Sequence, residues 1–208
     1  VRTNLRRLGV DNIATCDASR IRGPASDYLA APLKSIGVPP PRPAVPRLVL
    51  PAFGAARPMR DKRLAVIHPG SGSRRKNWPL SAFLALAERL EAKLGLHSLF
   101  VAGEADGRLV QELRQKRADH LLVEPDLADL ADLLNRAAVY IGNDSGVSHL
   151  AAAVGAPTIA LFGPTDPAVW APRGPKVTIL QRSRDPSSPP NVAVTEVFDA
   201  VRKNMPRL

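Results

Sequence analysis

The sequence predicts an α/β fold of the Rossmann-like type, in which helices cover both faces of a parallel sheet. Two observations carry this prediction. From residue 64 onward, short runs of apolar and β-branched residues alternate with longer stretches of helical periodicity, and the links between them are short. Apolar residues make up 45% of the 208 residues, which is enough to bury the core of such a fold.

The expected elements follow one another along this part of the chain. The first predicted helix shows the pattern clearly, since Phe83, Leu86 and Leu90 recur at helical spacing between Pro79 and Gly95. Thr195 is expected to cap the last helix. Strands are predicted at 64–69, 98–103, 121–123, 139–143, 158–163 and 177–180, and helices at 79–94, 106–117, 126–136, 146–154 and 195–202.

The first 60 residues have a different character. A helix at 2–8, a strand at 12–16 and a helix at 28–36 ending at Gly37 precede a proline-rich stretch, which predicts an extended linker. We therefore divide the chain into 1–60, the remnant of a preceding domain plus a linker, and 61–208, a ligand-binding domain. The chain begins with valine, which we interpret as the mark of a fragment.

Composition excludes several classes of protein. One cysteine allows no internal disulfide, no apolar run approaches the roughly 20 residues of a membrane span, and the first residues lack the apolar core of a signal peptide. The net charge is +10, and residues 1–63 hold 12 basic and 4 acidic side chains. This excess fits either attraction to an anionic surface or a solvated arginine-rich face. Nucleic acid is not expected as a partner, because no basic patch with interleaved aromatic residues is present.

Two loops that follow predicted strands have the composition of phosphate-binding loops. The first, H-P-G-S-G-S at 68–73, combines glycine, hydroxyl groups and the cations of Arg74, Arg75 and Lys76. Its spacing is neither that of a P-loop nor that of a dinucleotide-binding turn. In these sheets ligands bind at the carboxyl ends of strands, so the loop is a candidate site.

The second loop, N-D-S-G-V-S-H at 143–149, leads from a strand into a helix of small residues. The free N–H groups of the helix N-terminus favour a diphosphate. Asp144 is either the helix cap or an acceptor for sugar hydroxyls. His149 is either a structural histidine or a donor to a phosphate oxygen.

Together, H-P-G-S-G-S with K-x-W-P and the later N-D-S-G-x-x-H-L-A-A-A-x-G-A-P-T-I-A-L-F-G-P-T-D-P closely resemble glycosyltransferase family 9, that of the ADP-heptose:lipopolysaccharide heptosyltransferases. The resemblance covers about 64–180. It implies a GT-B fold, built from two Rossmann-like domains, and assigns this chain to the C-terminal, donor-binding half.

The resemblance also implies a role for each matching residue. Either Glu104 or Asp106 would bind the ribose hydroxyls, and adenine would lie near 125–127, beside Asp126. Lys76 and His149 would stabilise the charge of the leaving diphosphate. The implied donor-binding residues are Ser71, Gly72, Ser73, Lys76, Glu104, Asp106, Asp126, Asp144, Ser145, Gly146, Val147 and His149.

The family places its catalytic base in the N-terminal domain, so we expect this chain to bind the donor without supplying the base. No Asp-x-Asp occurs, which favours a reaction without metal, and no cofactor is expected. The implied partners are an ADP-sugar donor and an anionic lipopolysaccharide-core acceptor. The implied location is the cytoplasm, either free or peripheral at the inner face of the inner membrane. Two alternatives remain: a non-catalytic, degenerate nucleotide-sugar module, and a sugar-nucleotide epimerase-like protein.

Overall fold

The computed structural model describes residues 21, 23–39, 47–48, 61–117, 120–182, 185 and 189–205. The chain divides into two compact units, Val1–Val45 with Ala168–Trp170, and Pro46–Pro167 with Ala171–Leu208. The predicted helix at 2–8 and strand at 12–16 lie outside the described residues. So does the segment around residue 60, and the domain boundary that we placed there stays a prediction.

In the first unit, the predicted helix at 28–36 is two consecutive pieces. These are the α-helix α2 (Ala25–Ala30) and the 3₁₀ helix η2 (Ala31–Ile36), which has a proline in its first turn. The helix ends at Gly37 as expected, since this glycine takes a left-handed conformation with φ of 78°. The short helix α7 (Pro167–Trp170) was not predicted.

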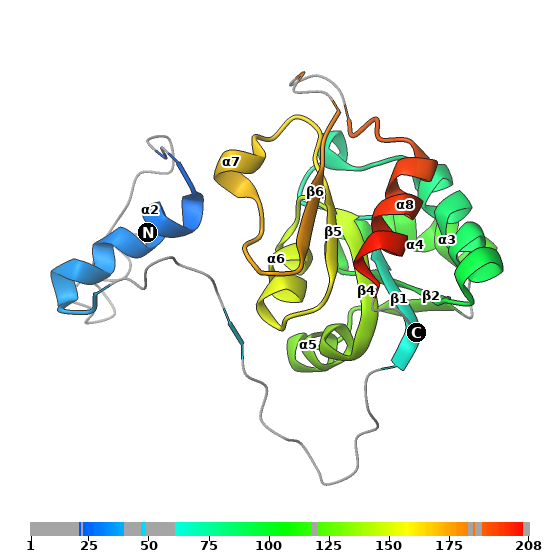
Figure 1. Cartoon of the computed structure of the whole chain (residues 1–208), viewed down its shortest axis with the longest axis horizontal. Helices are drawn as coiled ribbons and strands as arrows, with labels where there is room; N and C mark the ends of the chain where they lie inside the picture. Colours follow the sequence, from blue (N-terminus) through cyan, green and yellow to red (C-terminus); the bar gives the residue numbers. More distant parts are fainter. Residues whose placement is uncertain are drawn as a thin grey trace, which may run out of the picture. The chain divides into compact units, whose positions relative to one another are not determined.

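The second unit contains the predicted parallel sheet (Figure 1). All five strand pairings among the described residues are parallel, in the order β3-β2-β1-β4-β5-β6. The order reverses between β1 and β4, which makes their carboxyl ends the switch point where such sheets bind ligands. The strands are β1 (Asp61–His68), β2 (His97–Ala102), β3 (Leu121–Val123), β4 (Ala137–Asn143), β5 (Thr158–Leu161) and β6 (Val177–Leu180).

Two separate hydrophobic clusters show that both faces of the sheet are covered. Ala65 and Ile67 of β1 belong to one cluster, with buried residues of α3 (Leu80–Leu94) and α8 (Val194–Asn204). Val66 points to the other face and packs with α5 (Leu127–Arg136) and α6 (Gly146–Ala153). This alternation along one strand is what a doubly covered sheet requires. The remaining helix of this unit is α4 (Gly107–Arg117).

Helix ends in the second unit agree with the sequence to within one residue except at α8, whereas the helix predicted at 28–36 begins three residues earlier, at Ala25. Gly95 ends α3 in a left-handed conformation, and the Asp126 carboxylate caps α5 by accepting the N–H groups of Ala128 and Asp129. The prediction that Thr195 caps the last helix is wrong, because the helix starts earlier and Ala193 occupies the cap position. In the described part of the chain, no helix is long and apolar enough to span a membrane.

Truncation of Leu134 tests the second core cluster. This side chain of α5 is fully buried, and Leu134→Ala is expected to lower the free energy of unfolding by about 2–5 kcal/mol. Leu127, on the same helix, is 71% exposed, so Leu127→Ala serves as the matched control with a much smaller loss. Urea unfolding followed by circular dichroism measures both, and equal losses would contradict this description of the core.

Candidate functional site

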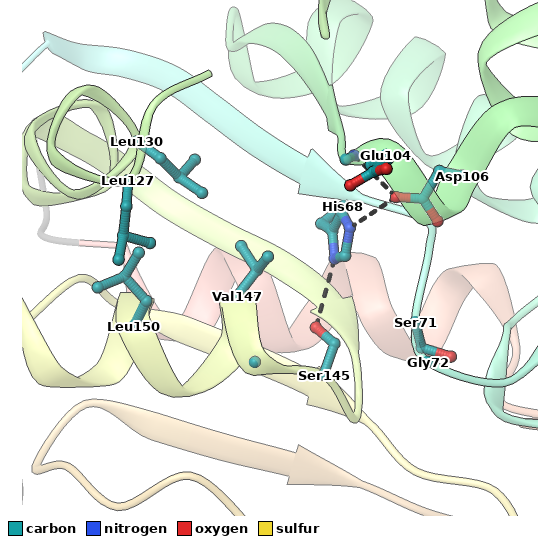
Figure 2. Close-up of a pocket in the computed structure, with 12 residues that line it drawn as sticks. His68, Ser71, Gly72, Glu104, Asp106, Leu127, Leu130, Ser145, Val147 and Leu150 are labelled. Atoms are coloured by element: carbon teal, nitrogen blue, oxygen red, sulfur yellow. Dashed lines mark hydrogen bonds and ion pairs between the residues drawn. The ribbon is translucent and has the colours of Figure 1, made fainter. Parts of the chain in front are cut away.

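A cavity lies at the carboxyl edge of the sheet, beside the ends of β1, β2 and β4 (Figure 2). Its volume is about 440 Å³, within the range of small-molecule sites. The lining residues are His68, Ser71, Gly72, Gly103, Glu104, Asp106, Leu127, Leu130, Ser145, Gly146, Val147 and Leu150. Many predicted site residues therefore surround one cavity, although they are separated widely in the sequence.

The cavity has an aliphatic side and a polar side. Leu127 and Leu130 of α5 face Val147 and Leu150 of α6 on the first side (Figure 2). The polar side carries the carboxylates of η4 (Glu104–Asp106), the imidazole of His68 and the hydroxyl of Ser145. Such a lining suits a ligand with a flat apolar part and a part rich in hydroxyl or phosphate groups.

Lys76 and Asp144, predicted from different loops, form an ion pair. Lys76 Nζ lies 3.0 Å from Asp144 Oδ2, and the two side chains are 24% and 8% exposed. Thr165 donates a second hydrogen bond to the same oxygen at 2.8 Å. Asp144 is thus held by two partners, and the nearby cation is already fixed in position before any ligand binds.

Asn143, which the sequence analysis did not single out, ties the two loops together. Its amide nitrogen donates to the Pro69 carbonyl at 2.9 Å, and its amide oxygen accepts the backbone N–H of Trp78 at 2.9 Å. The side chain is fully buried. Trp78 also packs edge-on against Phe83 and donates its indole N–H to the Val192 carbonyl.

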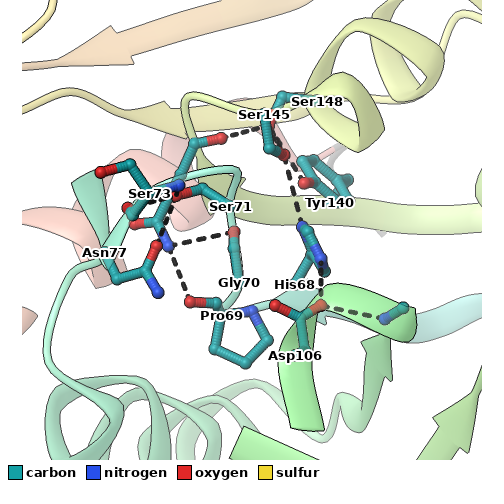
Figure 3. A network of polar contacts seen from close by, with 12 residues as sticks. His68, Pro69, Gly70, Ser71, Ser73, Asn77, Asp106, Tyr140, Ser145 and Ser148 are labelled. Carbon is teal, nitrogen blue, oxygen red and sulfur yellow. Dashed lines mark hydrogen bonds and ion pairs between the residues drawn. The ribbon is translucent and has the colours of Figure 1, made fainter. Parts of the chain in front are cut away.

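A buried polar network extends behind the cavity (Figure 3). His68 Nε2 lies 3.3 Å from Asp106 Oδ2, and His68 Nδ1 lies 3.3 Å from Ser145 Oγ. Beneath Ser145, the Tyr140 hydroxyl lies 3.0 Å from Ser148 Oγ, which donates to the carbonyl of Asn143. Burial raises the pKa of the Tyr140 phenol, so this hydroxyl keeps its proton at neutral pH.

The first loop was predicted as a site from its glycines, serines and cations, and His68 was not among the predicted site residues. The available signal was its position, since a polar residue that directly ends a buried strand at the carboxyl edge faces the site. Gly70 is required nearby, because a Cβ there would collide with the Asp106 carboxylate.

The structure separates Glu104 from Asp106, which the sequence left as equals. Asp106 is 7% exposed and accepts hydrogen bonds from His68 and from the Gly103 N–H. Burial raises its pKa, but these hydrogen bonds and the charge of His68 outweigh burial and leave the pKa below 3.8. Glu104 is exposed, lines the same cavity, and has no side-chain hydrogen bond to the residues described.

Other predicted residues have local tasks. The Ser71 hydroxyl lies 2.7 Å from the Ser73 carbonyl oxygen and 2.6 Å from Asn77 Oδ1, so it organises its own loop. The Asp126 carboxylate caps α5 and does not line the cavity. His149 is exposed on α6 and is likewise not part of the lining. Contacts of these side chains and of Ser73 with a donor stay predictions.

Comparison with known proteins decides the family. A sequence model described as glycosyltransferase family 9 (heptosyltransferase) matches residues 33–198. The chain belongs to this family.

Curated family 9 relatives match over shorter stretches. A lipooligosaccharide heptosyltransferase 2 of Haemophilus influenzae is 34% identical over 113 residues, 51% of this chain and 32% of the relative. A lipopolysaccharide heptosyltransferase 1 of Pseudomonas aeruginosa is 36% identical over 97 residues, 44% of this chain and 26% of the relative. The chain thus spans about a third of the length of the curated relatives it matches.

Solved structures show the same fold. A family 9 glycosyl transferase from Veillonella parvula superposes with a TM-score of 0.70 at 20% identity, over 93% of this chain and 62% of that one. The ADP-heptose lipopolysaccharide heptosyltransferase II of E. coli gives 0.68 at 18% identity, over 98% of this chain and 68% of that one. The predicted GT-B-type α/β fold is confirmed. In the described residues, no group of three or more His, Cys, Asp or Glu side chains is placed to hold a metal ion.

Removal of the Asn143 side chain tests the connection between the loops. Asn143→Ala leaves the Trp78 N–H and the Pro69 carbonyl without their buried partner. We expect the free energy of unfolding to fall by about 2–4 kcal/mol. Asn135→Ala, a partly exposed asparagine on α5, is the control. Urea unfolding measures both variants. An equal loss in the control would show that the hydrogen bonds of Asn143 to the first loop contribute nothing specific to stability.

Acid titration tests the ionised state of Asp106. Its folded-state pKa lies below 3.8, so the unfolded chain binds more protons as the pH falls. The stabilisation is complete above the unfolded pKa and is lost as the pH falls through the folded pKa. Below about pH 4, the wild-type stability should therefore fall more steeply than that of Asp106→Asn. Parallel curves from urea unfolding across this range would contradict the prediction.

Proposed function

We propose that this chain carries the donor site of a heptosyltransferase-type glycosyltransferase, which transfers a sugar from a nucleoside-diphosphate sugar to a lipopolysaccharide-core acceptor. The observation that carries the proposal is one cavity at the β1/β4 switch point, with an aliphatic side for a base and a polar side for ribose and diphosphate. Family membership favours a transferase over the epimerase-like alternative.

The cavity suggests where each part of the donor binds. The base would lie between α5 and α6, against Leu127 and Val147, and the ribose hydroxyls would donate to the free carboxylate of Glu104. The diphosphate would lie at the N-terminus of α6, where the N–H groups of Gly146 and Val147 lack helical partners. A structure of an E. coli heptosyltransferase with ADP-2-deoxy-2-fluoro heptose, 25% identical to this chain, supports adenine as the base and ADP-heptose as the donor.

Lys76, which is ion-paired with Asp144 in the turn before α6, would stabilise the negative charge of the leaving diphosphate. As the bond between the sugar and the diphosphate breaks, negative charge grows on the diphosphate. Lys76 is held by Asp144 and needs little reorganisation to share its ammonium protons with a phosphate oxygen. The helix dipole of α6 adds to the same stabilisation.

Lys76→Ala tests the donor site directly. The change removes a charge-assisted hydrogen bond and leaves the Asp144 carboxylate without its cation, so ADP should bind about ten- to 100-fold more weakly. Lys93→Ala, on the exposed side of α3, is the matched control and should bind ADP like the wild type. Isothermal titration calorimetry gives both constants, and equal affinity of the two variants would contradict the role of Lys76.

Metal dependence is tested on the same chain. The sequence holds no Asp-x-Asp, so ADP binding should be unchanged by EDTA and by added Mg²⁺. If EDTA abolished binding and Mg²⁺ restored it, a metal rather than Lys76 would hold the diphosphate. The transfer step is measured as ADP release that depends on a heptose-deficient lipopolysaccharide acceptor. Because the base is expected in the N-terminal domain, this chain alone should bind the donor without such release. In a protein that also carries that domain, release would support the transferase, and donor binding without release would favour the non-catalytic module.

A further inference from the structure

We propose that a second cavity, which adjoins the one described above, binds an acidic sugar unit of the acceptor, that is, a carbohydrate unit with a carboxylate or phosphate group. The inference deepens the proposed function and rests on it, because an acceptor is required only if the chain serves sugar transfer. The two arginines of this cavity take no part in the donor contacts proposed above.

The second cavity shares a wall with the first. Its volume is about 380 Å³, within the range of small-molecule sites. Ser71 and Asp106 line both cavities, and Figure 2 shows them on the polar side of the first one. A ligand in the second cavity would therefore lie beside the ribose and the diphosphate of the donor.

Two segments supply the rest of the lining. Arg74 and Asn77 belong to the loop after β1, and Arg108, Leu109 and Glu112 belong to the first turns of α4. Leu109 offers an apolar surface, whereas the other four side chains carry hydrogen-bonding groups. A sugar ring suits such a lining, because it has apolar C–H groups as well as hydroxyl groups.

Arg74 and Arg108 supply two guanidinium groups that can bind an anion. Both side chains are exposed, and neither forms an ion pair or a side-chain hydrogen bond with any residue that the structure describes. Glu112 follows Arg108 by four residues, which is the spacing of the ion pair between Asp132 and Arg136 on α5, yet these two side chains stay apart in the described structure. Guanidinium groups bind carboxylates and phosphates through paired hydrogen bonds, so both arginines are available for an acid group.

Asn77 adds an uncharged hydrogen-bonding group to the same cavity. Its amide oxygen lies 2.6 Å from the Ser71 hydroxyl (Figure 3). The other polar atom of this amide has no hydrogen-bond partner among the described residues. The side chain is half-buried and already oriented by its own loop, so its unused end can bond a ligand.

The carboxylates of the lining decide which class of anion fits. Asp106 and Glu112 equal the two guanidinium groups in number, so the lining has no net charge that would attract a small inorganic anion. Glu112 is exposed and has no side-chain partner in the described part of the chain, and a carboxylate accepts hydrogen bonds from hydroxyl groups. A ligand that joins an acid group to several hydroxyl groups satisfies both kinds of side chain. An acidic sugar is such a ligand.

The second cavity is held on fixed elements. Val110 and Leu113 anchor α4 in the core, and Arg108 and Glu112 lie on its exposed side. Group transfer requires that donor and acceptor are held next to each other, and two adjoining cavities meet this requirement. The proposal concerns the acidic group that anchors the acceptor and not the hydroxyl group that reacts.

A titration of the chain saturated with ADP tests the proposal. ADP fills the first cavity, and glucose 6-phosphate, glucuronate, glucose and inorganic phosphate are then added separately while ¹H–¹⁵N spectra of the labelled chain are recorded. With at least one acidic sugar, we expect saturable shifts of the backbone amide signals of 71–77 and 107–112. Glucose and inorganic phosphate should bind about tenfold more weakly or less. Comparison of glucose 6-phosphate with glucuronate shows whether the acid group is a phosphate or a carboxylate.

Three variants of α4 test the roles of its charges. Arg108→Gln removes one exposed guanidinium group, so it should weaken binding of the acidic sugar about tenfold and leave ADP affinity unchanged. Arg114→Gln, which alters an exposed arginine outside the lining, is the matched control and should bind both ligands like the wild type. Glu112→Gln removes a negative charge at constant size, so inorganic phosphate should bind more tightly and the preference for glucose 6-phosphate should fall. An unchanged preference would contradict the selection by carboxylates.

The outcomes separate this inference from the proposed function. Binding of ADP without binding of either acidic sugar overturns the inference alone. Binding of an acidic sugar without any binding of ADP contradicts the proposed function, and with it the role of the sugar as acceptor. Displacement of ADP by glucose 6-phosphate would place both ligands in the first cavity and overturn the proposal. Equal affinity for inorganic phosphate and glucose 6-phosphate, or equal effects of Arg108→Gln and Arg114→Gln, would overturn it as well.

Discussion

The site depends on the attachment of two loops to each other by the side chain of Asn143. The residue ends β4, and its amide bonds the loop that follows β1 at two points, Pro69 and Trp78. Neither partner is a side chain, so the interaction sets the path of the backbone rather than the position of one group. Because β1 and β4 are neighbours at the centre of the sheet, this single contact fixes the loops from which Lys76, His68 and Ser145 all arise.

The fold could be predicted because its elements repeat a simple pattern. The strands at 121–123 and 177–180 match the structure residue for residue, and the helix at 79–94 is off by one residue at its start. Errors fall where local chemistry is ambiguous. Thr195 has the side chain of a cap, but helix α8 begins before it, and the packing of Val197 and Val201 in the core sets its position. A cap contributes about 1 kcal/mol, less than the burial of two valines.

The site was predictable where residues act on a ligand and not where they act on one another. Lys76 and Asp144 carry charge in loops after strands, and the sequence indicates them directly. Asn143 and His68 matter because of contacts with residues that are distant in the sequence. Asn143 bonds Trp78, 65 positions away, and His68 bonds Asp106, 38 positions away, so no local sequence pattern indicates either contact. The choice between Glu104 and Asp106 shows the same limit. Both residues follow β2 directly, and the position of His68 decides which of the two carboxylates is already hydrogen-bonded within the chain.

Polar side chains of the site are paired with one another. Lys76 is ion-paired with Asp144, which holds its ammonium group at the turn before α6. A second fixed cation on the cavity wall would have to be desolvated without a partner, at a cost of several kcal/mol. His68, which lines the cavity, has such a partner, because Asp106 Oδ2 lies 3.3 Å from its Nε2 atom and both side chains are 7% exposed. Lys76 with Asp144 and His68 with Asp106 are therefore paired within the chain, so a ligand meets side chains whose positions are already set.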